Sequence, residues 1–336
     1  MVWLKFLLCL IIILFAGTKA ARYADVIAEK TGLGRIWIGL VLLALISSMP
    51  ELVTGISAVA LVKLPDLALG TLLGSCLFNL LILALLDVLY RNGSILSKAS
   101  RSHTLSAGLG ILLIALTAGS ILVGEGFSRL RLGWVGIPSI IVFLLYLLGM
   151  WRIFYYERNR IPASSPASPI QYGESSARGA WWKFTLAAAA VIGAGIWLAF
   201  IGDEIARVTH WDTTFVGSLL LAISTSMPEL VICIAALRLG AIDMAVADIL
   251  GANMINIAKI VLVDLFYTQG PVLAAVSRAH LITAVVTAAM SLLVIVGIAF
   301  RQKRKTFIVI SWYGLLLIGL YIFGAYALFA SGMAQG

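Results

Sequence analysis

Charged side chains are scarce in this chain of 336 residues, because aspartate, glutamate, lysine and arginine together make up only 12% of it. A soluble domain carries roughly twice that fraction, so the composition excludes an ordinary soluble globular protein. Cysteine is scarcer still, and Cys9, Cys76 and Cys233 all lie within apolar stretches. Their spacing is not that of a metal site, and we expect them to be small buried apolar side chains.

Long apolar runs take the place of the missing charge, and 62% of the residues are hydrophobic. Runs of about 20 residues are long enough to cross the roughly 30 Å hydrocarbon core of a bilayer as helices. The sequence therefore predicts an all-α polytopic membrane protein with ten transmembrane helices. We expect these helices near residues 2–18, 33–62, 66–90, 103–123, 132–155, 181–201, 213–238, 243–267, 280–300 and 306–330.

The net charge of +9 follows from the expected topology. If the N-terminus is outside, most of the lysines and arginines fall in loops on the inner side of the membrane. Cytoplasmic loops are enriched in these two residues, so the distribution predicts both termini outside and an even number of spans. The positive charge is therefore no indication of a nucleic-acid partner.

The first 20 residues, MVWLKFLLCLIIILFAGTKA, have the features of either a cleavable signal peptide or a first transmembrane helix. The motif WLKF at 3–6 is echoed by WWKF at 181–184, inside the chain. Because the N-terminal stretch matches an internal span, we expect it to be a retained first helix.

Several other motifs also occur twice, in the same order. SMPEL occurs at 48–52 and again at 226–230, an offset of 178 residues. After one deleted residue the offset is 177. At that spacing GSCLFN (74–79) pairs with GANMIN (251–256), DVLY (87–90) with DLFY (264–267), and SRSH (100–103) with SRAH (277–280). The series predicts that the chain consists of two related halves.

Each half covers five expected spans, at residues 1–155 and 181–336, and residues 156–180 form a cytoplasmic linker rich in proline and serine. Because five is odd, the two halves enter the membrane in opposite directions. Inverted-topology repeats of this kind are typical of secondary transporters, whose substrate sites lie near the bilayer midplane between the repeats.

Each half also places a Pro-Glu pair inside an apolar span, in SSMPEL at 47–52 and TSMPEL at 225–230. A carboxylate at the bilayer centre costs at least about 2.5–3.5 kcal/mol on insertion scales. If the halves pack about a pseudo-twofold axis, Glu51 and Glu229 approach each other, and their repulsion favours a cation between them. A hard divalent cation, which takes about six to eight oxygen ligands, is the expected occupant.

The prolines supply further oxygens. Pro50 has no N–H, so the carbonyl of Ile46 loses its helix partner, and Pro228 does the same to Ser224. Carbonyls released inside a membrane must face protein, water or ions. Hydroxyl and amide oxygens lie close by in the sequence, and we expect them to line the same site: Ser47, Ser48, Thr225, Ser226, Ser75, Asn79 and Asn256.

These segments resemble the two α-repeats of the sodium/calcium exchanger family, within the calcium/cation antiporter superfamily. The family pattern is close to G-T-S-x-P-E followed by G-S-N-x-F-N, and the similarity covers nearly the whole chain. The resemblance implies a ten-helix antiporter that exchanges Ca²⁺ for Na⁺ or H⁺ by alternating access. It implies that Glu51 and Glu229 bind Ca²⁺. It also implies that the ion sites are lined by Ser48, Ser75, Asn79, Ser226 and Asn256, with the backbone carbonyls near Ala44, Ser47, Ala222 and Thr225.

The chain departs from the family pattern within and near these motifs. The first motif reads I-S-S and the second S-T-S where the pattern has G-T-S. Cys76 replaces an asparagine, and Ala252 replaces a serine whose hydroxyl suits a monovalent ion. Asp248 adds a carboxylate, which we include among the candidate cation ligands. Lys259 adds an ammonium on the helical face of Asn256, where it replaces a Na⁺ ion, pairs with a carboxylate (Asp248 or Asp264) or extends to the membrane interface.

The polar residues proposed as ligands also have purely structural interpretations. The two asparagines can hydrogen-bond between helices, and the hydroxyls can bond to their own helices. Asp87 and Asp264 are expected near span ends, as solvated residues.

For the whole protein, an intramembrane enzyme with the two glutamates as an acid–base pair and a passive cation channel remain alternatives to an antiporter. The resemblance favours a transporter without enzymatic activity, with Na⁺ as coupling ion and H⁺ as the alternative. We expect no cofactor apart from the transported ions. We also expect no obligate protein partner, and a location in a prokaryotic plasma membrane.

Overall fold

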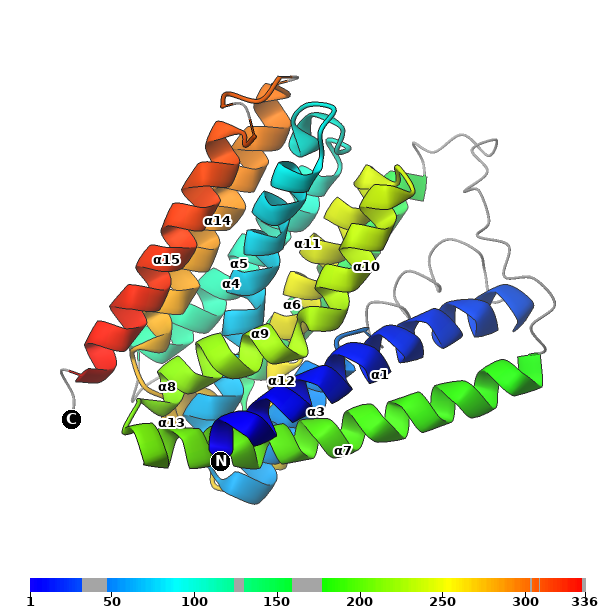
Figure 1. Cartoon of the computed structure of the whole chain (residues 1–336). Coiled ribbons are helices and arrows are strands. Elements are labelled where there is room, and N and C mark those ends of the chain that lie inside the picture. The colour runs from blue at the N-terminus through cyan, green and yellow to red at the C-terminus, as the bar shows by residue number, and fades with distance from the viewer. Residues whose placement is uncertain (32–46, 124–129, 159–176, 303, 308, 334–336) are drawn as a thin grey trace.

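The computed structural model describes residues 1–31, 47–123, 130–158, 177–302, 304–307 and 309–333 (Figure 1), and the described chain is mostly helical. The first half contains α1 (Val2–Thr31), α3 (Met49–Ser57), η1 (Ala58–Val62), α4 (Pro65–Leu89), η2 (Ile95–Ser97), α5 (His103–Val123) and α6 (Ile137–Arg158). The second half contains α7 (Ala177–Thr209), α8 (Thr213–Phe215), η4 (Val216–Leu221), α9 (Ala222–Thr225), α10 (Met227–Arg238), α11 (Ile242–Ala258), α12 (Ile260–Phe266), α13 (Val272–Ala275), α14 (His280–Phe300) and α15 (Trp312–Met333).

Eight helical segments in the described ranges are long and apolar enough to cross a membrane, and a bent pair over Thr213–Thr225 and Met227–Arg238 forms a ninth. The expected spans 103–123 and 280–300 coincide with α5 and α14. Only the second part of the expected span 33–62 is described, as the shorter apolar helix Met49–Val62. The start of that span and most of the expected linker lie outside the described residues.

Some expected boundaries are wrong, among them the start of the span at 306–330, where α15 begins only at Trp312. The span at 132–155 was expected to begin where the structure has a β-hairpin, formed by β1 (Arg131–Leu132) and β2 (Val135–Gly136) in antiparallel register. Gly133 takes a positive φ of 66° in the turn, a conformation that glycine adopts without a steric cost. The helix α6 therefore begins only at Ile137.

The outer helices carry the apolar surface that a bilayer requires. In the most apolar stretch of α6, only 22% of the residues are buried inside the protein, and the share for α15 is the same. Leu144, Leu147 and Trp151 of α6 are correspondingly exposed. In contrast, 78% of the window of α4 and 72% of that spanning α11 and α12 is buried, so these helices form the interior.

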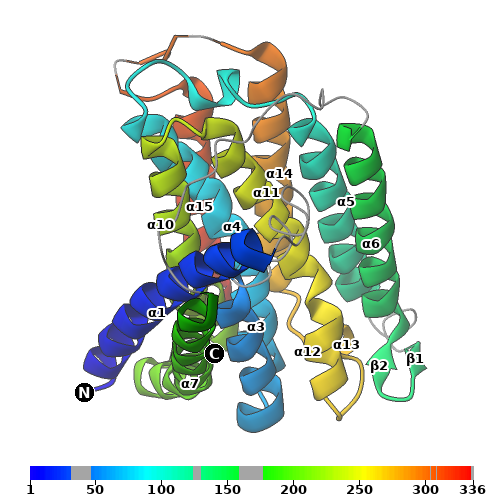
Figure 2. The ribbon, with the colours of Figure 1, turned by 90° about the vertical axis from the view of Figure 1, so that its right-hand side faces the viewer.

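The helices α1 and α7 lie side by side in opposite directions and cross the upright bundle at an angle (Figures 1 and 2). Lys5 of α1 and Glu204 of α7 form an ion pair at 2.7 Å. The packing of the halves is reciprocal, because α3 of the first half contacts α7 and α10 of the second half contacts α1. The start of α1 and the end of α15 lie toward the same end of the bundle (Figures 1 and 2).

Glycines allow the interior helix α4 to lie against the π-helical turn η4. A Cβ at Gly74 would lie 2.2 Å from the carbonyl oxygen of Ser218, and a Cβ at Gly70 would lie 3.1 Å from the Cα of Gly217. Both glycines therefore permit close approach. Gly251, the equivalent of Gly74 in the second half, has no such role, because no atom of the described chain lies within 4 Å of a Cβ built there.

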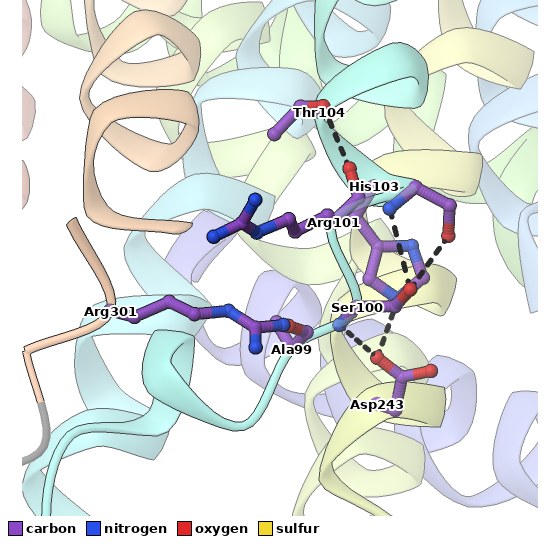
Figure 3. A network of polar contacts seen from close by, with 8 residues as sticks. Ala99, Ser100, Arg101, His103, Thr104, Asp243 and Arg301 are labelled. Carbon is purple, nitrogen blue, oxygen red and sulfur yellow. Dashed lines mark hydrogen bonds and ion pairs between the residues drawn. The ribbon is translucent and has the colours of Figure 1, made fainter. Parts of the chain in front are cut away.

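Two histidine–aspartate contacts join the halves at equivalent positions. His103 Nε2 lies 2.9 Å from Asp243 Oδ1, which also accepts the backbone N–H of Ser100 (Figure 3). His280 Nε2 lies 3.1 Å from Asp66 Oδ1, which also accepts the backbone N–H of Ser277. Each residue of the first contact stands 177 positions from its counterpart in the second.

We call these contacts the His–Asp clasps. Asp66 begins α4 and Asp243 begins α11, and these helices run in opposite directions, so the clasps lie at opposite ends of the bundle (Figure 1). Near the clasp at His103, Arg301 donates a hydrogen bond to the carbonyl of Ala99 (Figure 3).

The expectation that Asp87 and Asp264 are solvated is wrong, because both side chains are fully buried. Asp87 accepts hydrogen bonds from the backbone N–H of Ile95 and from residues that begin α15, whereas Asp264 accepts one from the backbone N–H of Val272. Each aspartate therefore satisfies an N–H eight residues further along the chain. Both tie a loop to a helix end instead of facing water.

Candidate cation site

The site is built around two helix breaks with the same backbone geometry. Ser48 has φ −89° and ψ 15°, Ser226 has φ −89° and ψ 8°, and each is followed by a helix with proline in its first turn. In the second half, α9 and α10 meet at Ser226 with a bend of 43°. The expected helix break at Pro228 is therefore present, as proline chemistry requires. Ile46 and Ala44, whose carbonyls were expected to contribute, lie outside the described residues.

Glu51 and Glu229 follow the two breaks and face the interior, with 0% and 1% of their surface exposed. The negative charges of the two carboxylates repel each other. Ser226 Oγ donates a hydrogen bond of 2.9 Å to Glu51 Oε1, so the break of one half directly contacts the glutamate of the other. The Oε2 atoms of both glutamates are buried without a hydrogen-bond partner among the described residues.

The other hydroxyls of the motifs gather at the same place. Thr225 interacts with the Glu51 carboxylate through its side chain and also bonds back to the carbonyl of Ala222 at 3.2 Å. Ser75 Oγ lies 3.5 Å from Thr225 Oγ1, a long contact between the halves. Ser47 and Ser48 are fully buried, and Ser48 Oγ has no hydrogen-bond partner.

The expected amides take different partners. Asn79 Nδ2 donates to Asn253 Oδ1 at 3.0 Å, and Asn79 Oδ1 is buried without a partner in the described ranges. Asn256 Oδ1 accepts a hydrogen bond from Lys259 instead. The interhelical role considered for the asparagines is therefore present for Asn79, whose free carbonyl oxygen also leaves it available as a ligand.

Asn253 is a polar residue of the site that sequence reasoning missed. Its Nδ2 donates to the carbonyl of Cys76 at 3.1 Å, while Cys76 Sγ contacts the carbonyl of Asn253 at 3.5 Å. These two residues occupy equivalent positions in the motifs GSCLFN and GANMIN, so the reciprocal contact joins α4 to α11 at the centre of the protein. The asparagine within GANMIN was the available signal.

Asp248 lies at the edge of the site. Its side chain is buried, and its negative charge repels that of Glu229. Cys233 Sγ donates a hydrogen bond of 3.6 Å to Asp248 Oδ2. Within the described chain the Asp248 side chain bonds to this cysteine and not to the other expected ligands. All three cysteines are buried, as expected.

Lys259 places a cation inside the site. It occupies the break between α11 and α12, only 3% of its surface is exposed, and its Nζ donates to the carbonyl of Ser48 at 2.5 Å and to Asn256 Oδ1 at 3.0 Å. Of the alternatives considered for this lysine, direct pairing with Asp248 or Asp264 is wrong. The positive charge of the ammonium attracts the negative charges of both Glu51 and Glu229.

These residues have the donor chemistry of a hard-cation site. Within the described ranges, no three histidine, cysteine, aspartate or glutamate side chains lie close enough to hold a metal ion by themselves. A cation between the glutamates must therefore complete its shell with neutral oxygens, which hard cations accept. The unpartnered oxygens available are Glu51 Oε2, Glu229 Oε2, Ser48 Oγ and Asn79 Oδ1.

Comparisons with known proteins identify relatives of this chain. The chain is 26% identical over 270 residues to the inner membrane protein YrbG of Escherichia coli (strain K12), which covers 78% of this chain and 79% of the relative. The crystal structure of the H⁺/Ca²⁺ exchanger CAX covers 99% of this chain and 86% of its own, with a TM-score of 0.72 at 14% identity. A structure of the sodium-calcium exchanger NCX_Mj covers 97% of this chain and 99% of its own, with a TM-score of 0.60 at 20% identity.

At these identities, the likeness to CAX and NCX_Mj shows a shared fold. Membership is shown by the family profile described as "Sodium/calcium exchanger protein", which matches residues 1–154 and 179–330. Its two matched segments include both Pro-Glu motifs and all the candidate ligands. The chain is therefore a multi-pass membrane protein of the sodium/calcium exchanger family, a transporter and not an enzyme.

Proposed function

We propose that this protein is a secondary active antiporter that exchanges Ca²⁺ for Na⁺ across the membrane by alternating access. The observation that carries the proposal is the pair of buried, mutually repelling carboxylates of Glu51 and Glu229, each with an oxygen that has no hydrogen-bond partner in the part of the chain that the structure describes. Two such carboxylates are costly in a membrane interior unless a cation neutralises them.

In this proposal Glu51 and Glu229 bind Ca²⁺ directly. Hydroxyl and amide oxygens beside them complete the ion sites, and Asp248 contributes charge from the edge through its coupling to Glu229. The neutral ligands are the expected ones: Ser47, Ser48, Ser75, Asn79, Thr225, Ser226 and Asn256. Because both glutamates are buried, an ion reaches them only if helices move, as alternating access requires.

The proposal includes two inverted five-helix repeats, residues 1–155 and 181–336, joined by a cytoplasmic linker at 156–180. It is supported by the reciprocal contacts of Asp66 and Asp243, and by the equivalent loop contacts of Asp87 and Asp264. Ten spans with both termini outside agree with the start of α1 and the end of α15 lying toward one end of the bundle (Figure 1). We place the protein in a prokaryotic plasma membrane.

Proton coupling is the second candidate. The position of Ala252, which is buried in α11, has no hydroxyl where the family pattern has a serine, so one oxygen for a monovalent ion is missing. Carboxylates can exchange Ca²⁺ for protons without additional oxygen ligands. The comparison with CAX and NCX_Mj shows that this fold serves both coupling ions.

Purified protein in liposomes tests the proposal. With Ca²⁺ inside and outside at equal concentration, an outwardly directed Na⁺ gradient should drive Ca²⁺ uptake, and a pH gradient of equal driving force should not. The reverse dependence would assign proton coupling. A passive channel would give no uphill movement under either gradient.

Substitution of the glutamates provides the second part of the test. Glu51→Gln and Glu229→Gln should each abolish exchange, because each removes one of the two carboxylates that bind the ion in this proposal. Glu204→Gln is the matched control, since Glu204 lies at the surface paired with Lys5. Full exchange in both site variants would refute the proposed function.

A further inference from the structure

Lys259 breaks the equivalence of the two halves at the centre of the site. It stands three residues after Asn256, and the equivalent residue of the first half, three after Asn79, is Ile82. Ile82 is fully buried in the apolar core. The fold therefore accommodates an apolar side chain at this position in one half, and packing does not explain a buried ammonium in the other.

The partners of the ammonium are those of a bound cation. Lys259 Nζ is held by the backbone carbonyl of Ser48 and the amide oxygen of Asn256, two neutral oxygens contributed by different halves. The carbonyl of Ser48 belongs to the helix break before Pro50. The hydrogen bond that this carbonyl accepts from the backbone N–H of Leu52 is long, at 3.4 Å, whereas the bond from Lys259 Nζ is 2.5 Å.

The charge at the site is also altered by this lysine. Glu51, Glu229 and Asp248 carry three formal negative charges, and the ammonium of Lys259 reduces the sum to two, the charge that one divalent cation balances. Without the lysine, the same oxygens would accept a monovalent cation beside the divalent one.

We propose that the ammonium of Lys259 is a tethered cation that occupies one monovalent-ion position of the site, between the Ser48 carbonyl and the Asn256 amide. The protein then exchanges each Ca²⁺ for fewer free Na⁺ ions than its oxygen ligands could hold. Lys259 is a specificity-determining residue that sets the number of coupling ions. This inference rests on the proposed function, because it counts the Na⁺ ions that compete with Ca²⁺.

The test is a binding experiment on the full chain in detergent. The apparent Kd for radioactive Ca²⁺ is measured at several Na⁺ concentrations, with choline keeping the ionic strength constant. Lys259→Ile, which copies the equivalent residue Ile82, should steepen the dependence of log Kd on log Na⁺ by about one, because one further Na⁺ is displaced for each Ca²⁺. Lys259→Arg should keep the wild-type slope, since it keeps the cation.

A second measurement does not depend on Ca²⁺. Na⁺ alone should raise the melting temperature of Lys259→Ile more than that of the wild type, because only the variant has gained a Na⁺ position. Lys98→Ile is the control for losing a lysine, since Lys98 is exposed in a loop outside the site. If Lys259→Ile does not fold, Lys259→Met is measured in the same way.

The outcomes separate this inference from the proposed function. An unchanged Na⁺ slope together with an unchanged Na⁺-dependent melting temperature, in a folded neutral variant, would overturn the role of Lys259. Failure of the wild type to bind Ca²⁺ would refute the proposed function instead. In that case the comparison of melting temperatures still decides whether Lys259 holds a monovalent-ion position.

Discussion

The hydroxyl of Ser226 donates a hydrogen bond of 2.9 Å to the carboxylate of Glu51, although the two residues are 175 positions apart in the chain. Ser226 is the residue at which the helix of the second half breaks, and Glu51 follows the equivalent break of the first. The two Pro-Glu motifs therefore meet in the interior of the protein. The hydroxyl that contacts the glutamate of the first half belongs to the second half.

Ser226→Ala should lower the stability of the protein, because Glu51 Oε1 is buried and loses its donor. A hydrogen bond to a charged group contributes about 1.5–3 kcal/mol, so we expect a clear fall in melting temperature measured in detergent. Ser224→Ala is the control, since the Ser224 hydroxyl donates to the carbonyl of Leu220 four residues earlier and not to a carboxylate of the described chain. Equal melting temperatures for the two variants would contradict the contact.

Gly74→Ala should destabilise the protein strongly, because its new Cβ would lie 2.2 Å from the carbonyl oxygen of Ser218 and one of the backbones must move. Overpacking of this kind costs about 1–3 kcal/mol or more. Gly251→Ala is the matched control, since Gly251 is the equivalent residue of the second half and a Cβ there meets no described atom within 4 Å. A larger loss of folded protein for Gly251→Ala in size-exclusion chromatography would show that the tight helix contact is misplaced.

Loss of either His–Asp clasp should destabilise the end of the bundle at which it lies. Asp66→Ala should cost more than Asp243→Ala, because the Asp66 side chain is 25% exposed and the Asp243 side chain 56%. Water can replace the lost acceptor more readily at the exposed site, so we expect a difference of about 1 kcal/mol. Thermal unfolding of both variants measures it, and the opposite order would contradict the burial argument.

Tyr313→Phe should destabilise the loop between α4 and α5. The Tyr313 hydroxyl donates to Asp87, accepts the backbone N–H of Leu96, and contacts Ser94 Oγ at 2.9 Å. Removing it leaves buried polar groups without partners, at about 1–3 kcal/mol. Tyr326→Phe is the control because Tyr326 is exposed on α15. Proteolysis should cleave the loop at 91–102 faster in Tyr313→Phe, and equal cleavage rates in the two variants would contradict this prediction.

Much of the site was predictable because its residues are chemically conspicuous. A carboxylate or a proline within an apolar run is rare, so Glu51, Glu229, Pro50 and Pro228 marked the site without any knowledge of the fold. The repetition of the motif then indicated that both copies act together. The proximity of the two glutamates could be expected from an axis relating the halves. In the structure their negative charges repel each other.

Other features could not be read from residue type. Asp87 and Asp264 were expected in water because they stand at span ends, but the loops fold back and supply N–H groups to them. Gly251 occurs in a motif equivalent to that of Gly74, yet only Gly74 meets a neighbouring backbone. In each case, the deciding atoms come from a distant part of the chain.

The sequence by itself determined that this protein lies in a membrane, that its motifs occur twice in the same order, and which side chains are costly to bury in an apolar span. These properties follow from composition, spacing and the free energy of transferring charge out of water. Only the tertiary structure decided which oxygens meet, and that Lys259 bonds to Ser48 and Asn256 and not to a carboxylate. The reason is physical: a side chain's partners depend on how helices pack, and packing is a property of the whole chain.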